Sequence, residues 1–225
     1  MNRLLSLWCF LFLKPLIGWT FIKEVRGKEN IPQRNFILAA NHQSHFDQIV
    51  TGYICVPRRF HMIGQIDKYE GISGFLRDFL YFLAGTIPVN RKDKESKRKA
   101  LLKAIEVLKK GDILIIYPEG TRSRTGRIQE GKLGVAKIYL KTGLPILPVG
   151  IKGTFELLPP GKVFPKIKKA IIINIGKPLF FKEDLEKVRN LECDSLRYQE
   201  ICKKITEEVM GEIKNLIYDK KNSHC

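Results

Sequence analysis

Apolar residues along the chain gather into short continuous runs that alternate with longer stretches in which apolar positions recur every three or four residues. The short runs predict buried strands, and the longer stretches predict amphipathic helices. Strands are expected at residues 36–40, 60–64, 87–89, 113–117, 146–150 and 170–175, and helices at 47–55, 75–84, 96–110, 131–141 and 194–218. This alternation predicts an α/β fold: a single domain with a mixed, largely parallel sheet flanked by helices.

The most hydrophobic stretch lies ahead of this pattern, at residues 4–22, and carries one charge, Lys14. A membrane-spanning helix needs about 20 apolar residues, and Lys14 and Pro15 fall where a charge and a missing backbone donor are costly. No small-residue cleavage site of a signal peptide follows. The favoured interpretation is a helix–break–helix element in one leaflet; a full span and a core-packed first helix are the alternatives. We expect residues 1–26 to form a membrane-associated helical segment and residues 27–225 to form the α/β domain.

The charge of the chain indicates the chemistry of its partners. Forty Lys and Arg residues against 23 Asp and Glu give a formal net charge of +17, which favours nucleic acid, an acidic membrane surface or a phosphorylated substrate. The basic residues are not interleaved with aromatic residues as in RNA-binding modules, so we expect no nucleic-acid partner. Five scattered cysteines without a Cys-x-x-Cys pair argue against a disulfide framework or zinc site and favour a reducing, cytoplasmic setting.

The first candidate site follows the predicted strand at 36–40. There the sequence Asn-His-Gln-Ser-His-Phe-Asp places His42 at a strand end and Asp47 at the start of the next helix. A carboxylate that accepts from one imidazole nitrogen leaves the other nitrogen to act as a general base. No Gly-x-Ser-x-Gly elbow occurs, so attack by a substrate hydroxyl is favoured over an acyl-enzyme. A structural histidine and a metal site with His42, His45 and Asp47 are the alternatives, but the metal site lacks an obvious further ligand.

Two further motifs follow strands. The sequence Gly-Thr-Ile-Pro-Val-Asn-Arg ends at Arg91, whose planar guanidinium suits a phosphate monoester. The sequence Tyr-Pro-Glu-Gly-Thr-Arg-Ser-Arg begins at Tyr117, directly after the β-branched run at 113–116, and brings Glu119 and Arg122 to the mouth of the sheet. A surface charge and a loop salt bridge are the plain structural alternatives for Arg91 and Glu119. A Walker-like spacing at 126–132 has Leu133 where Ser or Thr must hold magnesium, so we expect no nucleotide cofactor.

These motifs, in this order, resemble the sequence blocks of the glycerolipid acyltransferases. His42 and Asp47 match the Asn-His-x-x-x-x-Asp block, and Tyr117 replaces the usual Phe of the Phe-Pro-Glu-Gly-Thr-Arg-Ser block. The second block departs from the family because Asn90 replaces an Asp before Arg91, which puts any ion pair at that place in doubt. Residues 144–149 resemble the fourth block, to which we assign packing and acyl positioning. The resemblance covers about residues 27–154 and identifies 27–225 as an acyltransferase domain.

The resemblance implies a 1-acyl-sn-glycerol-3-phosphate acyltransferase of the bacterial type. Such an enzyme moves an acyl group from acyl-CoA or acyl carrier protein to the sn-2 hydroxyl of lysophosphatidate and makes phosphatidate, with no cofactor or metal. It would sit on the cytoplasmic face of the cell membrane as a monotopic or peripheral protein and contact anionic lipids. The implied roles are catalysis by His42 and Asp47, phosphate binding by Arg91, Arg122 and, more weakly, Lys68, and acceptor positioning by Glu119, Gly120 and Thr121.

Other functions share parts of this pattern. A sibling acyltransferase that uses glycerol 3-phosphate, another lysophospholipid or a lipid A precursor would have the same motifs. A non-catalytic basic protein that binds membrane or RNA would have the same charge. The largely apolar stretch at 75–84 is interpreted first as part of the core and second as the lining of an acyl-chain slot.

Overall fold

The computed structural model of the chain describes residues 3–65, 85–159, 161–162, 164–189, 191–193 and 195–218. The helix expected at 75–84 and the phosphate contact expected at Lys68 lie outside these residues. Among the described residues, seven strands form one sheet in the order β1-β7-β6-β2-β5-β3-β4. The strands are β1 (Ile22–Arg26), β2 (Ile37–Ala40), β3 (Phe60–Gln65), β4 (Thr86–Val89), β5 (Ile113–Ile116), β6 (Ile146–Lys152) and β7 (Ile171–Ile175).

The sheet is mixed and largely parallel. Only β6 and β7 pair antiparallel among the described strands; the other neighbouring strands, β1 with β7 included, run parallel. In the central strands β2 and β5 every residue is buried. Continuous burial explains their uninterrupted apolar sequences, since a parallel strand covered on both faces has no polar side. The strands β2, β3, β4, β5 and β6 therefore end at one edge of the sheet, called here the carboxyl edge.

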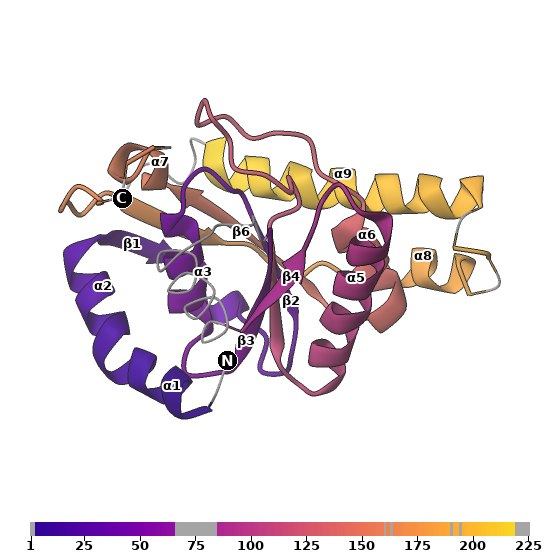
Figure 1. Cartoon of the computed structure of the whole chain (residues 1–225), viewed down its shortest axis with the longest axis horizontal. Coiled ribbons are helices and arrows are strands. Elements are labelled where there is room, and N and C mark those ends of the chain that lie inside the picture. The colour runs from indigo at the N-terminus through magenta and orange to yellow at the C-terminus, as the bar shows by residue number, and fades with distance from the viewer. Residues whose placement is uncertain are drawn as a thin grey trace.

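Helices cover both faces of the sheet (Figure 1). They are α1 (Arg3–Trp8), α2 (Lys14–Thr20), α3 (Phe46–Cys55), α5 (Lys94–Lys109), α6 (Gly134–Thr142), α7 (Thr154–Leu157), α8 (Lys182–Lys187) and α9 (Leu196–Tyr218), with a π-helical turn η1 (Cys9–Leu13) and a 3-10 turn η2 (Lys28–Asn30). One apolar core joins α5, α6 and α9 to the side of β2 that carries Ile37 and Ala39. The other core joins α2 and α3 to the side that carries Leu38 and Ala40. The predicted fold class is confirmed.

The N-terminal segment is helical throughout Arg3–Thr20, so the expected break at Lys14 and Pro15 is wrong. Pro15 lies at the start of α2, directly after the wider π-helical turn η1. Such a turn relieves the clash between a proline ring and the preceding helical turn, and the helix bends instead of breaking (Figure 1). The helix Arg3–Thr20 has 18 residues and a mean hydropathy of 1.2, which meet the criteria for a membrane span by length and composition alone. We call Arg3–Thr20 the N-terminal rod.

The structure also corrects the boundary expected after residue 26. Residues 22–26 form β1, which pairs with β7 and so belongs to the sheet. Only Phe21 separates the end of α2 from the start of β1. The helical segment therefore ends before Ile22, and the sheet begins there.

Candidate functional site

The predicted site residues meet at the carboxyl edge of the sheet. His42 follows β2, Glu119 and Arg122 follow β5, and Arg91 follows β4. Because β2 and β5 are adjacent and parallel, their ends bring the first and third motifs together. The backbone N–H of Ser123 donates to the carbonyl of His42 at 2.8 Å, which joins the two loops directly.

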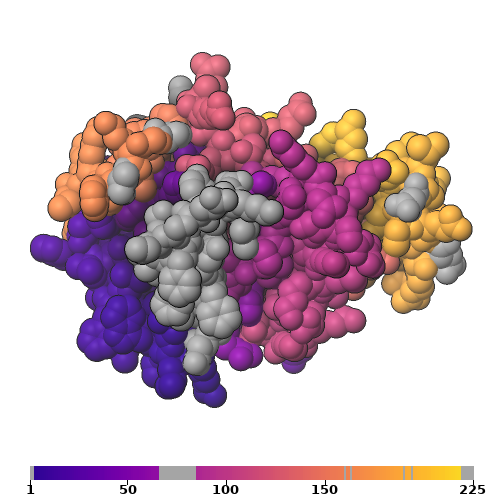
Figure 2. Space-filling model, in the orientation of Figure 1, coloured from indigo at the N-terminus to yellow at the C-terminus, as the bar shows by residue number. Residues whose placement is uncertain are grey.

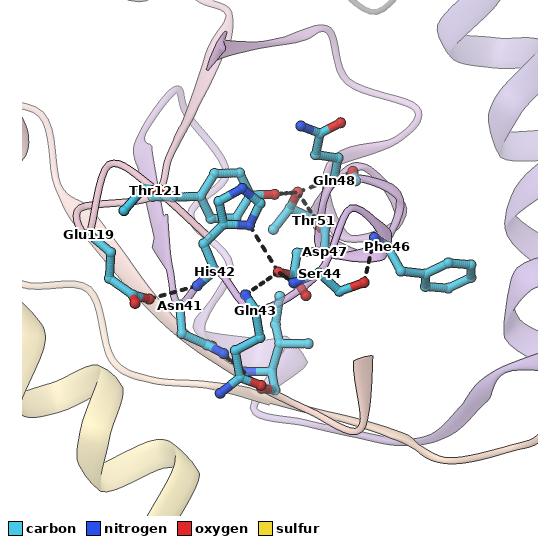
Figure 3. A network of polar contacts seen from close by, with 12 residues as sticks. Asn41, His42, Gln43, Ser44, Phe46, Asp47, Gln48, Thr51, Glu119 and Thr121 are labelled. Carbon is cyan, nitrogen blue, oxygen red and sulfur yellow. Dashed lines mark hydrogen bonds and ion pairs between the residues drawn. The ribbon is translucent and has the colours of Figure 1, made fainter. Parts of the chain in front are cut away.

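His42 and Asp47 form the predicted pair. The Nδ1 atom of His42 lies 2.9 Å from Oδ2 of Asp47, and both side chains are buried, with His42 only 7% exposed (Figure 3). Asp47 lies in the first turn of α3, where the helix dipole favours a negative charge. A hydrogen bond from Nδ1–H to this carboxylate fixes the tautomer and leaves Nε2 as the proton acceptor. Since His42 lines the cleft described below, this geometry suits general-base catalysis.

The carboxylate of Asp47 is used asymmetrically. Its Oδ2 atom also accepts from the backbone N–H groups of Gln43 at 2.6 Å and Ser44 at 2.7 Å. Its Oδ1 atom is buried and has no hydrogen-bond partner among the described residues. Three donors on one oxygen orient the carboxylate toward His42 and also shape the turn between β2 and α3.

Glu119 supports the histidine from the neighbouring strand. Its Oε1 accepts from the backbone N–H of His42 at 2.7 Å, and its Oε2 accepts from that of Gln129 at 3.0 Å. The carboxyl group is almost fully buried, and this burial raises its pKa above the ordinary range, although the two N–H donors oppose the shift. Both oxygens therefore bind backbone, which favours a role in holding the site over direct contact with an acceptor.

Tyr117 contributes a contact that sequence reasoning missed. Its ring stacks on the imidazole of His42, with centroids 4.1 Å apart and planes 14° apart. Its hydroxyl lies 2.9 Å from Oγ1 of Thr51, which donates to the carbonyl of Asp47 at 2.9 Å. The replacement of Phe by Tyr in the third block was the available signal, because only Tyr can bond to Thr51.

The described residues line a cleft of about 1230 Å³ at this edge. His42, Arg91, Gly120, Thr121 and Arg122 all contribute to its wall, so the structure brings these predicted residues together. Among the described lining residues, none is acidic. The basic ones are Arg91, Lys94, Lys97, Arg98, Arg122, Arg124, Lys132 and Lys137. A concave surface with one sign of charge concentrates anionic ligands.

Two backbone features shape the loops around the cleft. Gly120 has a φ of +69°, which side chains disfavour, and its N–H donates to the carbonyl of Tyr117 in a tight turn. Asn90 accepts from the backbone N–H of Lys92 at 3.0 Å and donates its own backbone N–H to the hydroxyl of Ser96. The substituted Asn90 therefore organises the turn into α5 through hydrogen bonds.

A mixed α/β sheet with a buried His–Asp pair beside a cationic cleft is typical of one class of protein. This class consists of enzymes that use general-base chemistry on an anionic substrate. The sequence matches the family model named Acyltransferase over residues 23–152, more than half of the chain. The chain belongs to this family, and the resemblance seen in its motifs is confirmed.

Relatives agree with this assignment. The chain is 36% identical over 132 residues to a 1-acyl-sn-glycerol-3-phosphate acyltransferase of Borreliella burgdorferi, covering 58% of this chain and 51% of that protein. It is 30% identical over 200 residues to the protein of that name from Saccharomyces cerevisiae, covering 84% and 64%. The crystal structure of the 1-acyl-sn-glycerophosphate (LPA) acyltransferase PlsC from Thermotoga maritima is similar, with a TM-score of 0.61 and 31% identity over 91% of this chain and 79% of that one. The chain spans about half the length of the curated relatives it matches.

Proposed function

We propose that this protein is a 1-acyl-sn-glycerol-3-phosphate acyltransferase that makes phosphatidate. The observation that carries the proposal is the His42–Asp47 pair, 2.9 Å apart, on the wall of a cleft that also presents Arg91 and Arg122. The family match and the printed names of the relatives support the choice of acyl transfer over other general-base reactions.

In the proposed reaction, Nε2 of His42 removes the proton from the sn-2 hydroxyl of lysophosphatidate while that oxygen attacks the thioester carbonyl. The C–O bond forms, the C–S bond breaks, and the imidazolium returns the proton to the departing thiolate. Asp47 stabilises the imidazolium through its hydrogen bond to Nδ1. Acyl-CoA and acyl carrier protein both supply such a thioester.

Arg91 and Arg122 are the proposed phosphate ligands. A guanidinium group binds a phosphate through two parallel hydrogen bonds and fixes its orientation as well as its charge. Held at the cleft wall, the phosphate would direct the sn-2 hydroxyl toward His42, and this positioning supplies much of the rate. Thr121 and the turn at Gly120, also on the cleft wall, complete the proposed acceptor site; Lys68 stays a proposed phosphate contact from the sequence.

We place the protein on the cytoplasmic face of the cell membrane, with the N-terminal rod in contact with anionic lipids. Large apolar side chains along the rod are exposed, among them Trp8, Leu11, Phe12, Leu16 and Trp19. Exposed apolar surface of this extent on one helix is typical of a membrane contact. The excess of basic residues favours the anionic leaflet.

The decisive experiment compares wild-type protein with His42→Ala in an assay of labelled lysophosphatidate with each acyl donor. We expect kcat to fall at least ~100-fold, because general-base catalysis contributes that much or more. His61→Gln is the matched control, since His61 lies near the start of β3, away from the carboxyl edge where β3 ends. Near-normal turnover by a folded His42→Ala protein would refute the proposal.

The same assay tests the acceptor. Glycerol 3-phosphate, other lysophospholipids and a lipid A precursor are offered in place of lysophosphatidate. A higher kcat/KM for any of these would assign the chain to a sibling activity with the same site. Absence of transfer to every acceptor would favour a non-catalytic membrane-binding protein.

A further inference from the structure

The segment between α7 and β7 exposes two large apolar side chains far from the N-terminal rod in sequence. Phe164 is 85% exposed and Ile167 is 84% exposed. The segment is not loose, because the backbone N–H of Lys166 donates to the carbonyl of Leu157 at 2.9 Å and that of Lys162 donates to Pro159. A short, hydrogen-bonded loop that exposes an aromatic and an aliphatic side chain to solvent indicates an interaction site.

The charges of this loop indicate which partner. Its described residues include four exposed lysines, Lys162, Lys166, Lys168 and Lys169. The sequence contains no Asp or Glu between Glu156 and Glu183, so no acidic residue within the loop offsets them. Phe164 and Ile167, with lysines around them, are complementary to the surface of an anionic bilayer. There the acyl chains lie directly beneath the phosphate groups.

The place of the loop agrees with this partner. The backbone N–H groups of Ala170 and Ile171, at the end of the loop, both donate to the carbonyl of Phe21, the residue that follows the N-terminal rod. Trp19, two residues earlier, is 75% exposed. In Figures 1 and 2 the orange part of the chain that contains the loop lies beside the indigo N-terminal part. The two exposed apolar surfaces are therefore neighbours in space.

We propose that residues 161–162 and 164–169 form a second membrane contact, in which Phe164 and Ile167 enter the acyl region of an anionic bilayer and the lysines bind lipid phosphates. This inference goes beyond the proposed acyl transfer, which needs no residue of the loop. It also has a consequence for the site, because the carbonyl of Leu158, just before the loop, accepts from Oγ of Ser44 at 2.7 Å. A second contact here holds the carboxyl edge, and with it the His42 turn, close to the lipid surface.

Tryptophan fluorescence tests the insertion directly. The two native tryptophans, Trp8 and Trp19, are changed to Phe, and Phe164→Trp is introduced in the full-length protein. With vesicles of phosphatidylglycerol and phosphatidylcholine, we expect a blue shift and quenching by brominated acyl chains. Leu196→Trp in the same background is the matched control, since Leu196 is 80% exposed at the start of α9, at the other end of the molecule in Figure 1. Emission from position 164 that matches the control, while the protein sediments with vesicles, would overturn the second contact and leave the acyltransferase proposal standing.

A charge-matched pair of triple variants tests the lysines. Lys166→Gln, Lys168→Gln and Lys169→Gln together should weaken binding to anionic vesicles by about fivefold per lysine, the equivalent of ~1 kcal/mol each. Lys99→Gln, Lys103→Gln and Lys110→Gln remove the same charge from exposed positions on and next to α5 and should weaken binding much less. Transfer to lysophosphatidate in detergent micelles should stay at the wild-type rate in both. Equal losses in the two triple variants, or binding of the loop variant at wild-type strength, would overturn the proposal.

Discussion

At the scale of single residues, the imidazole of His42 is constrained from several directions. Asp47 holds Nδ1, Glu119 accepts from the backbone N–H, and Ser123 donates to the carbonyl. Tyr117 adds a stacked ring against the face of the imidazole. For the proposed general base, such support would lower the cost of orienting the imidazole in each turnover, because the ring is already held in place.

The stacked ring can be separated from its hydroxyl by substitution. Tyr117→Phe keeps the ring and loses the bond to Thr51, so we expect a loss of about 1 kcal/mol in the free energy of unfolding and kcat within a few fold of wild type. Tyr117→Leu removes the stacking surface and should lower kcat about tenfold or more with little change in KM. Steady-state kinetics and urea unfolding in detergent check both variants. A Phe variant as slow as the Leu variant would show that the hydroxyl, and not the ring, supports His42.

Arg122 is expected to act on acceptor binding. In Arg122→Ala, KM for lysophosphatidate should rise about tenfold or more while KM for the acyl donor changes little, because only the acceptor loses its charged ligand. Arg127→Ala is the control, since Arg127 is an exposed arginine of the same loop that is not part of the described cleft wall. An unchanged dependence of rate on lysophosphatidate concentration would exclude Arg122 from phosphate binding.

At the scale of elements, the strands that the sequence predicted are those with continuous apolar runs. The runs at 36–40 and 113–117 correspond to β2 (Ile37–Ala40) and β5 (Ile113–Ile116), because burial on both faces removes polar residues from such strands. The missed strand, β1, reads Ile-Lys-Glu-Val-Arg and lies at the edge of the sheet. Its charged residues look amphipathic, and its pairing with β7 is distant in sequence, so no local pattern reveals it.

The same reasoning separates the predictable part of the site from the rest. The His42–Asp47 contact joins residues five positions apart, and spacing alone predicts it. The stacking of Tyr117 on His42 depends on β5 lying next to β2, which is a matter of strand order in the sheet. Strand order is set by packing of the whole domain, and a single sequence does not display it.

Near the starts of three strands, His61 links β3 to its neighbours and makes stability depend on pH. Its Nδ1 lies 2.9 Å from the carbonyl of Gly85 and its Nε2 lies 3.2 Å from Oδ2 of Asp112, which also pairs with Arg59. Burial lowers the pKa of His61 below its ordinary value, although both acceptors oppose the shift. The folded chain therefore binds this proton less readily than the unfolded chain, so the stability is present above pH ~6.5 and is lost as pH falls.

We expect His61→Gln to reduce the fall in unfolding free energy between pH 7.5 and pH 5.5. The reduction is at most about 1.4 kcal/mol, since the unfolded histidine gains its proton near pH 6.5, one unit above the lower pH. Urea unfolding in detergent at the two pH values measures the difference. Identical pH dependence in both proteins would show that His61 does not titrate differently on folding.

At the scale of the whole molecule, the N-terminal rod, which is the proposed membrane contact, packs against the same domain that carries the His42 cleft. The N-terminal rod packs Ile17 into the core beside α3, and Phe21 and Ile22 are also buried. Deletion of residues 1–22 would therefore remove part of the core and one residue of β1 together with the proposed membrane contact. Substitution of exposed residues separates these effects.

Trp8→Ser, Leu11→Ser and Phe12→Ser together should reduce binding to anionic vesicles at least tenfold. These side chains are about half exposed or more, so their transfer into lipid supplies binding energy without contributing much to folding. Co-sedimentation with vesicles measures binding, and urea unfolding in detergent should give the wild-type midpoint. Binding at wild-type strength would shift membrane attachment to the basic surface.

A single residue, Phe21, separates the end of α2 from the start of β1, so no flexible linker lies between the N-terminal rod and the sheet. If the N-terminal rod contacts the bilayer as proposed, its direct connection to β1 would hold the His42 cleft at a nearly constant distance from the lipid surface. A Gly-Ser insertion ahead of Phe21 would introduce a flexible linker between the N-terminal rod and β1. Turnover on vesicles should then fall while turnover in micelles, where substrate comes from any direction, stays the same.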